Sequence, residues 1–370
     1  MRVVVDARPR VSGLTVSSTD LLGPSPEWDR FVTAAPGGDL VQSSAWAGFK
    51  RELGTSTHLV VIRRNHEIVG GAVLHVRRVA PGIRVALVVR GPLVSGDDVA
   101  LGECAIDALE RLAGTVSAQL LAVQAPVGHV ALEHQLDARG YRLGFPALAP
   151  TATSLIDLQK TNEQLMAAAG KTRRKNLRLG KEQGFTFSTD ADVPQFARLY
   201  AGSAARTGFV PLQLSTLEAQ WRHLGPTGHL SMMFASYEGR PIAGAWMSSF
   251  AGTVTGKLVG WDNLSEQPRY VNDALNWETF QWARSAGAHT FDLGGFDRPS
   301  AERILFGAPP PESFAKSSSA NKATYGGQIV LFPSARFKVL TPLVGRPMGA
   351  FTDHLLASTR AAKLVARFRN

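Results

Sequence analysis

Two stretches of the chain repeat the same order of sequence patterns, and this repeat limits the folds that the chain can adopt. Residues 58–76 read HLVVIRRNHEIVGGAVLHV, and residues 229–249 read HLSMMFASYEGRPIAGAWMSS. Each has an apolar segment, a polar turn and a second apolar segment with a central glycine, which is the pattern of a β-hairpin. A helical pattern ending in glycine precedes each hairpin, and a helix and then a strand follow it. This order predicts an α/β (α+β) fold with a mixed sheet, present twice in tandem.

The length of the chain agrees with two domains. Its 370 residues are 44% hydrophobic, enough to bury a large core. The connector PALAPTATS, residues 146–154, has little helical or strand pattern. We therefore expect an N-terminal domain over residues 1–150 and a C-terminal domain over residues 151–335. The basic tail, residues 336–370, is interpreted as a helix that docks on a domain, with contact to an anionic membrane as the alternative.

Charge and cysteine content narrow the partners and the compartment. The chain has 40 Lys and Arg against 30 Asp and Glu, a net charge of +10. This excess favours a polyanionic partner such as nucleic acid, a pyrophosphate or an anionic membrane face. The single cysteine, Cys104, rules out an internal disulfide and suits a reducing cytoplasm. We find no signal peptide and no apolar run that could span a bilayer. A cytoplasmic protein that can touch the inner membrane face is expected.

The most basic stretch, GKTRRKNLRLGK at residues 170–181, begins like the end of a phosphate-binding loop. Such a loop needs glycine five positions before its Gly-Lys pair, but Leu165 stands there, within a helical pattern. On a helix, Arg173 points away from a common face that spans about 120°. The cations on that face are Lys171, Arg174, Lys175, Arg178 and Lys181. Since neighbouring like charges destabilise a helix, we interpret this basic stripe as an anion-binding surface, with a solvated helix face as the alternative.

Several motifs carry a resemblance to one family. The segment KTRRKNLRLGKEQG is similar to the segment that opens the second domain of the FemABX family, the nonribosomal peptidyltransferases of bacterial cell-wall synthesis. Other motifs resemble the family in the right order between residues 42 and 327. These are QSSAWAGFKRELG, VVRGPLV, ARTGF, LNWETFQWARSAGAHTFDLGGF and NKATYGG. No single motif is diagnostic, but their common order is specific.

The resemblance implies a fold and an activity. The fold is two tandem GNAT-like acyltransferase domains with mixed central sheets, and no coiled-coil arm is expected because the second half holds no sustained heptads. The activity is transfer of an amino acid from aminoacyl-tRNA to the peptide of a UDP-linked or lipid-linked peptidoglycan precursor. No metal or organic cofactor is implied, and we expect a monomer.

The same resemblance assigns the catalytic candidates. Lys322 takes the place of the lysine in the late motif, which is associated with stabilising charge in the transition state; Lys316 is the alternative. Asp292 ends a predicted strand before two glycines and is the second candidate, although such a sequence is often only a turn.

The resemblance also assigns substrate-binding residues. Lys50 and Arg206 match family positions that hold the phosphates of the precursor or nearby groups, and a structural salt bridge is the alternative for each. The basic stripe would then face tRNA or the phosphorylated precursor. Arg90, in the Arg-Gly-Pro motif, and Tyr325, in the late motif, are assigned to the same task. The carboxylates after the Arg-Gly-Pro motif, Asp97 and Asp98, are interpreted as caps of the following helix.

Two other functions compete with this one. An acyl-CoA-dependent N-acyltransferase would act on an amino sugar or metabolite in envelope polysaccharide synthesis, but neither RGPLVSGDD nor EQPRYVNDA has the glycine spacing of a pyrophosphate loop. A non-enzymatic nucleic-acid binder would need aromatic residues among its cations, and residues 170–183 contain none. The chain also lacks a Gly-x-Ser-x-Gly elbow and the HExxH spacing, so neither a covalent nucleophile nor a metal is indicated.

Overall fold

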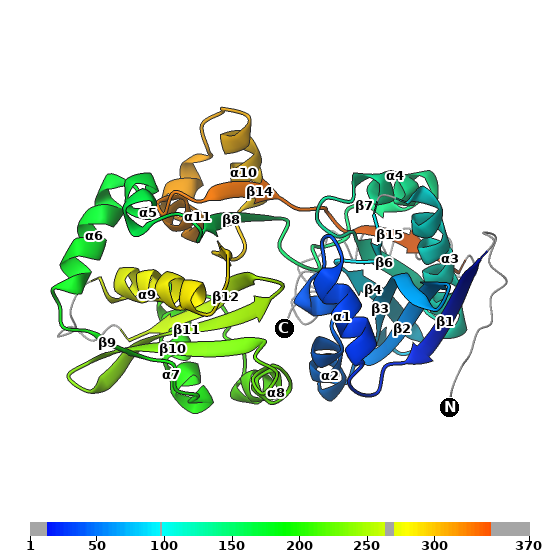
Figure 1. Cartoon of the computed structure of the whole chain (residues 1–370), viewed down its shortest axis with the longest axis horizontal. Helices are drawn as coiled ribbons and strands as arrows, with labels where there is room; N and C mark the ends of the chain where they lie inside the picture. The colour runs from blue at the N-terminus through cyan, green and yellow to red at the C-terminus, as the bar shows by residue number, and fades with distance from the viewer. Residues whose placement is uncertain (1–12, 97, 263–269, 342–370) are drawn as a thin grey trace. The chain divides into compact units, whose positions relative to one another are not determined.

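A computed structural model describes residues 13–96, 98–262 and 270–341. The chain divides into two units, which we treat separately (Figure 1). Unit 1 comprises the chain up to Ala149 together with the segment from Phe332 onward, and unit 2 comprises Pro150–Leu331. Both units have a mixed α/β architecture, as the sequence predicts.

Unit 1 is built on an eight-stranded sheet in the order β1-β2-β3-β4-β6-β15-β7, with β5 paired to β3. Its strands are β1 (Leu14–Asp20), β2 (Ser56–Arg64), β3 (Glu67–Ala80), β4 (Ile83–Val89), β5 (Leu93–Val94), β6 (Leu120–Gln124), β7 (Arg142–Leu143) and β15 (Arg336–Val339). Its helices are α1 (Pro26–Ala34), α2 (Ser44–Glu52), α3 (Val99–Thr115) and α4 (Val130–Ala138), with a 3-10 turn at Leu40–Gln42. Among the described strands of this sheet, only β4 and β6 are paired in parallel, and α3 connects them.

Unit 2 is built on a seven-stranded sheet in the order β14-β8-β13-β12-β11-β10-β9. Its strands are β8 (Ala152–Asp157), β9 (Thr186–Ser188), β10 (Leu230–Tyr237), β11 (Arg240–Phe250), β12 (Thr253–Trp261), β13 (Thr290–Asp292) and β14 (Gln328–Leu331). Its helices are α5 (Asn162–Ala168), α6 (Lys171–Lys181), α7 (Val193–Thr207), α8 (Leu214–Leu224), α9 (Val271–Ser285), α10 (Arg298–Leu305) and α11 (Ser318–Ala323), with a 3-10 turn at Glu312–Lys316. Here β12 and β13 form the parallel pair, connected by α9.

The two predicted hairpins are confirmed as β2–β3 and β10–β11. Each turn places two residues with positive φ between its strands, Asn65 and His66 in the first and Glu238 and Gly239 in the second. Two consecutive positive φ values match the right-handed twist of a tight hairpin. The central glycine is required in the first hairpin, because a Cβ on Gly71 would lie 2.2 Å from a carbonyl oxygen of β2.

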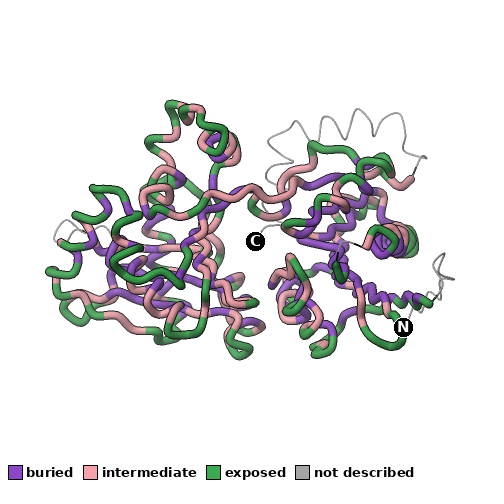
Figure 2. Tube along the Cα trace, turned by 45° about the horizontal axis from the view of Figure 1, so that its top comes forward, coloured by how far each residue is buried: buried purple, intermediate pink, exposed green. Residues whose placement is uncertain are grey.

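The core of each unit lies between its sheet and the helix that connects its parallel strands. In unit 1, Ile106 and Leu109 of α3 pack among sheet residues such as Leu74 and Leu121. In unit 2, Leu275 and Phe280 of α9 take the corresponding place. Figure 2 shows buried residues concentrated in the interior of each unit, and β3 and β11 each contribute a long buried run. The core therefore fixes the ends of the parallel strands, where the candidate site lies.

One strand of each sheet comes from an unexpected part of the sequence. In unit 1, β15 is inserted between β6 and β7, and in unit 2, β8 is inserted between β13 and β14. Residues 336–339 are thus a strand of unit 1 and not the start of a helical tail. The reason is that Arg336 and Phe337 are buried and hydrogen-bonded within the sheet on both sides. The rest of the predicted tail, residues 342–370, lies outside the described residues.

Candidate active site

The predicted catalytic residues lie where the parallel strands β12 and β13 separate. The ladder ends at the pair formed by Thr255 and Asp292, and Gly294 follows with a φ of +73°. A Cβ on Gly294 would lie 2.5 Å from the carbonyl oxygen of Gly256. The close approach therefore requires glycine, and it fixes the direction of the carbonyl groups at the end of β13.

Lys322 binds this strand end through its ammonium group. The side chain extends from α11, and its Nζ donates to the carbonyl oxygens of Gly294, at 3.0 Å, and Gly295, at 2.6 Å. Burial lowers the pKa of Lys322, and the nearby carboxylate of Asp292 opposes this shift. An ammonium group carries three N–H donors. Two of them bind these carbonyl oxygens, so within the described residues the third is left for a ligand.

Asp292 organises the same turn from the other side. Its Oδ1 accepts from the backbone N–H of Gly294 at 2.7 Å and from the hydroxyl of Thr153, which also donates to the Gly294 carbonyl at 3.1 Å. The structure therefore brings Asp292 and Lys322 together around Gly294, which the sequence did not specify. Asp292 thus orients the turn through its hydrogen bonds, and the Lys322 side chain reaches the same turn from α11.

A buried cluster behind Lys322 connects α6, α9 and the late motif. The Arg173 guanidinium contacts the carboxylate of Asp273, lies 4.1 Å from the ring centre of Tyr325, and donates to Thr324 Oγ1 at 2.9 and 3.1 Å. The Tyr325 hydroxyl accepts from Asn276 Nδ2 at 2.9 Å. The cluster fixes the residues that follow Lys322. Sequence analysis placed Arg173 off the basic stripe, but nothing in the sequence indicated its partner.

Tyr325 is only 5% exposed, and burial raises its pKa. Its hydroxyl also lies 3.4 Å from Asp273 Oδ1. The ring packs edge-on against Phe280, with ring centres 5.7 Å apart. These contacts of Tyr325 all lie within unit 2. They suit a residue that positions Lys322, whereas Tyr325 was predicted to contact the substrate.

The basic stripe is on a helix, α6, as expected. Lys171, Arg174, Lys175, Arg178 and Lys181 are exposed, whereas Arg173, Leu177 and Gly180 on the opposite face are buried. Arg174 donates to the carbonyl oxygen of Ala169 and so caps α5. Within residues 13–96, 98–262 and 270–341, none of the five cations forms an ion pair. The stripe is therefore available to a polyanion.

Lys50, in unit 1, is buried on α2 beside aromatic rings. Its side chain is 8% exposed, and its Nζ lies 5.2 Å from the ring centre of Trp46 and 5.0 Å from that of Phe49. Burial, with a smaller contribution from Arg77, lowers the pKa of Lys50 to about 7. Burial and the proximity of Lys50 lower the pKa of His75 to about 3, so this histidine is neutral near neutral pH. A bound anion would favour the charged form of Lys50.

The two arginines assigned to substrate lie in different units. Arg90 follows β4 in unit 1 and is 3% exposed. Its guanidinium carbon lies 4.2 Å from the ring centre of Phe332, and its Nε lies 3.8 Å from a carboxylate oxygen of Asp39. Arg206 ends α7 in unit 2, is exposed, and stacks 4.7 Å from the ring centre of Trp261 at the far end of β12 from Asp292. Arg206 is thus not part of the Lys322 cluster.

The remaining features of the described residues are the cap of α3 and the absence of a metal-ligand cluster or a membrane-spanning helix. Asp98 caps α3 by accepting from the backbone N–H of Leu101 at 3.1 Å, as predicted, whereas Asp97 lies outside the described residues. The residues described here contain no group of three His, Cys, Asp or Glu side chains that could hold a metal ion. They also contain no helix that is both long and apolar enough to cross a bilayer.

Comparison with known proteins places these features in context. Residues 24–135 match the model of the FemAB family, and residues 167–302 match that of the acetyltransferase (GNAT) domain. Over 229 residues the chain is 26% identical to a Lipid II:glycine glycyltransferase of Staphylococcus saprophyticus, covering 58% of this chain and 55% of that protein. The chain therefore spans about half the length of the curated relatives it matches.

Solved structures show the same fold over most of the chain. The crystal structure of FemX has a TM-score of 0.75 with 18% identity, and the match covers 88% of this chain and 97% of FemX. A tandem GNAT protein from the clavulanic acid biosynthesis pathway has a TM-score of 0.52 with 12% identity, over 88% of this chain and 99% of that one. The duplicated GNAT architecture is thus shared with both.

Proposed function

Because the chain belongs to the FemABX family, we propose that it transfers an aminoacyl group from aminoacyl-tRNA to an amine on the peptide of a peptidoglycan precursor. The observation that carries the proposal is the ammonium of Lys322, which two carbonyl groups hold at the end of β13. A cation fixed in this way can meet an oxyanion without first reorganising. The name of the relative, Lipid II:glycine glycyltransferase, supports a lipid-linked acceptor.

The proposed reaction is aminolysis of an ester. The amine nitrogen of the acceptor attacks the ester carbonyl carbon of the aminoacyl-tRNA, a C–N bond forms, and the carbonyl oxygen becomes an oxyanion. The remaining N–H of Lys322 donates to this oxyanion. When the intermediate collapses, the ester C–O bond breaks, and the ribose oxygen takes up a proton that the amine has released to solvent. The products are an amide and an uncharged tRNA, and no covalent enzyme intermediate is formed.

The other assigned residues support this step. Asp292 positions Lys322 through Gly294, because its carboxylate is hydrogen-bonded to that turn. Tyr325 positions Lys322 through its packing in the Arg173 cluster. The basic stripe of α6 contacts the tRNA backbone, since the helix presents five exposed cations. In unit 1, Lys50 and Arg90 take part in binding the phosphorylated precursor. In unit 2, Arg206 is a separate proposed phosphate-binding residue.

The proposed setting follows from the acceptor. A lipid-linked precursor would bring the protein to the inner face of the cell membrane, and a UDP-linked one would let it act in the cytoplasm away from the membrane. We propose a monomer, as each unit already encloses its own core.

One observation favours a second candidate, an acyl-CoA-dependent N-acyltransferase. Residues 167–302 match the acetyltransferase model, and they contain β12 and β13, the parallel pair of unit 2. In this alternative the acyl group leaves a thioester, and the same Lys322 ammonium would stabilise the oxyanion. The acceptor would be an amino sugar or a small metabolite of envelope polysaccharide synthesis.

One experiment separates the two candidates. The protein is incubated with a charged tRNA pool or with acetyl-CoA, and with UDP-linked or lipid-linked muropeptide or an amino sugar, and the products are identified by mass. An amino acid residue added to the muropeptide only with charged tRNA supports the proposal. An acetyl group added only with acetyl-CoA supports the alternative and excludes the proposal.

A further inference from the structure

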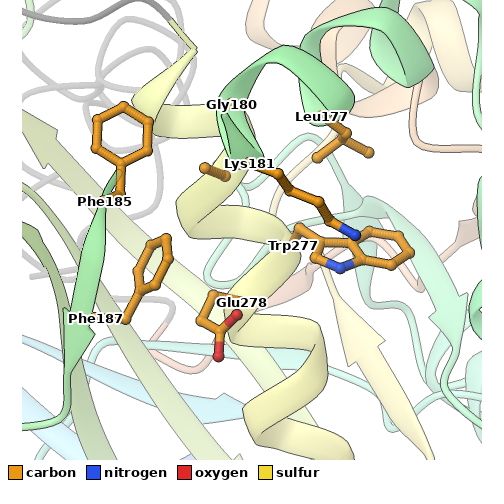
Figure 3. A pocket seen from close by; sticks show the side chains of 8 residues that line it. Leu177, Gly180, Lys181, Phe185, Phe187, Trp277 and Glu278 are labelled. Carbon is orange, nitrogen blue, oxygen red and sulfur yellow. The ribbon is translucent and has the colours of Figure 1, made fainter. Parts of the chain in front are cut away.

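A cavity beside the basic stripe has the composition of a base-binding site. It has a volume of about 270 Å³ and is lined by α6, the segment that follows it, and α9. Figure 3 shows Phe185 and Phe187 on one side, Trp277 with the Lys181 side chain on the other, and Glu278 below. Lys181 Nζ lies 5.7 Å from the ring centre of Trp277. The cavity therefore combines flat apolar walls with one cation and one carboxylate.

Close packing of two helices creates this cavity. A Cβ on Gly180 would lie 3.3 Å from the Cβ of Ala274, so these small residues let α6 approach α9. The larger side chains of Leu177 and Trp277 lie beside this crossing and line the hollow. The chain then continues into β9, the edge strand of the sheet, which places Phe187 at the cavity.

A second hollow continues the first along α9. It has a volume of about 460 Å³, shares Phe187 and Glu278 with the first, and is also lined by Gln281 and Trp282. Glu278 and Gln281 are three residues apart on α9 and so lie on the same helix face. In the described part of the chain, Gln281 Nε2 is buried without a hydrogen-bond partner. An acceptor atom of a ligand would satisfy this donor.

We propose that these joined hollows bind unpaired bases from the single-stranded 3′ end of a tRNA, whose phosphates contact the basic stripe of α6. Aromatic walls stack on bases, and cations beside them bind the backbone, as in other single-strand sites. The Glu278 carboxylate accepts from the exocyclic amino group of cytosine or adenine, and the Gln281 amide donates to a ring acceptor of the same base. The site therefore prefers bases that carry an amino group over uracil. The -CCA end common to tRNAs has an amino group on every base.

The structure supplies what the basic segment itself lacks. No aromatic residue occurs between residues 170 and 183, which argued on sequence alone against a non-enzymatic protein that binds single strands there. In the fold, Trp277 comes from α9 and Phe187 from β9, and both line the cavity beside Lys181. The inference rests on the proposed function, because it names the site for the tRNA donor.

The test compares RNA preference in two matched variants. Fluorescence anisotropy measures the affinity for a short single strand ending in ACCA and for an oligouridine strand of equal length. We expect the wild-type protein to prefer the ACCA strand, and Glu278→Gln to reduce that preference about tenfold, because the new amide accepts less strongly and can also donate to uracil. Glu182→Gln makes the same substitution at an exposed site next to α6, outside the cavity. It should retain the preference.

Charge loss is tested in the same way. Lys181→Gln should weaken binding of both strands by several-fold and lower the salt dependence. The control Lys160→Gln removes an exposed lysine of unit 2 outside the cavity, and we expect little change. Equal affinity for both strands in the wild-type protein, or the same preference in the Glu278 and Glu182 variants, would overturn the inference.

Product formation distinguishes this failure from failure of the proposed function. If charged tRNA still yields product while Glu278→Gln behaves like Glu182→Gln in binding and turnover, the donor is tRNA but its bases bind elsewhere. If no aminoacyl product forms with either acceptor while the ACCA preference persists, the cavity binds single-stranded RNA and the transferase proposal is wrong.

Discussion

The buried pair of Arg173 and Asp273 gives the sharpest prediction about what holds the candidate active site in place. Both side chains are at most 11% exposed, and they connect α6 with α9. Removing one partner of a buried pair leaves an uncompensated charge, which typically costs about 3–5 kcal/mol. Asp273 keeps two further contacts, from Asn176 Nδ2 at 3.0 Å and from the Tyr325 hydroxyl at 3.4 Å. We therefore expect Arg173→Met to lower the free energy of unfolding by about 3 kcal/mol, the lower end of that range.

The reasoning is tested by a double-mutant cycle in urea. Asp273→Asn removes the charge that Arg173→Met leaves behind, so the double variant should be more stable than the sum of the two single costs predicts, by about 2 kcal/mol. The control is Arg198→Met, which removes the exposed partner of Asp262 in the same unit and should cost at most about 1 kcal/mol.

Turnover adds a second measurement to the same variants. Because Arg173 donates to Thr324 and to the Asn321 carbonyl, its loss should loosen the turn that carries Lys322 and lower kcat more than it changes KM. A cost below about 1 kcal/mol for Arg173→Met, or additive effects in the cycle, would refute the view that the pair is a buried, coupled connection.

Three further outcomes are expected. Lys322→Met should lower kcat by about 10²–10³-fold in the product-mass assay with KM little changed, since the oxyanion loses its cation; an unchanged kcat would remove Lys322 from catalysis. Gly294→Ala should cost about 1–3 kcal/mol more in urea unfolding than Gly307→Ala, because both have positive φ but only Gly294 meets a backbone carbonyl; equal costs would contradict the close approach. Burial lowers the pKa of His75 from 6.5 to about 3 in the folded state. Below pH 6.5 the unfolded chain therefore binds a proton that the folded protein does not, and the free energy of unfolding falls. Between pH 8 and pH 5 the wild-type protein should lose about 2 kcal/mol more than His75→Leu, and parallel pH profiles would refute this.

Local patterns in the sequence predicted the repeated part of the fold. Apolar segments on either side of the turn residues Asn65-His66 and Glu238-Gly239 located both hairpins, and the helices and parallel strands after them followed in order. The P-loop lookalike was rejected because Leu165 lies in a helix, and the structure places it in α5. Helix α8 was missed, since the sequence before the second hairpin was assigned to a single helix.

Features that depend on distant partners were not predictable. The four residues of β15 look like part of a basic amphipathic tail, and only pairing with β6 and β7 makes them a strand. The partner of Arg173 could not be named because Asp273 lies on a helix far along the chain. The same limit applied to the cavity, whose aromatic walls come from α9 and β9 and not from the basic helix.

Resemblance located the catalytic candidates, and the structure specified their geometry. Motif order pointed to Lys322 and Asp292, but only the fold brings both to Gly294. Lys316, the alternative to Lys322, lies in a separate 3-10 turn, and no hydrogen bond links its side chain to that strand end within the described residues.

The central claim is tested most directly by the mass of the muropeptide product. Wild-type protein is given charged tRNA and a lipid-linked muropeptide, with acetyl-CoA in a parallel reaction and Lys322→Met as the inactive control. The account predicts a mass increase of one or more amino acid residues that requires charged tRNA and is lost in the variant. An acetyl mass that requires acetyl-CoA, or an aminoacyl product that forms equally well with Lys322→Met, would contradict it.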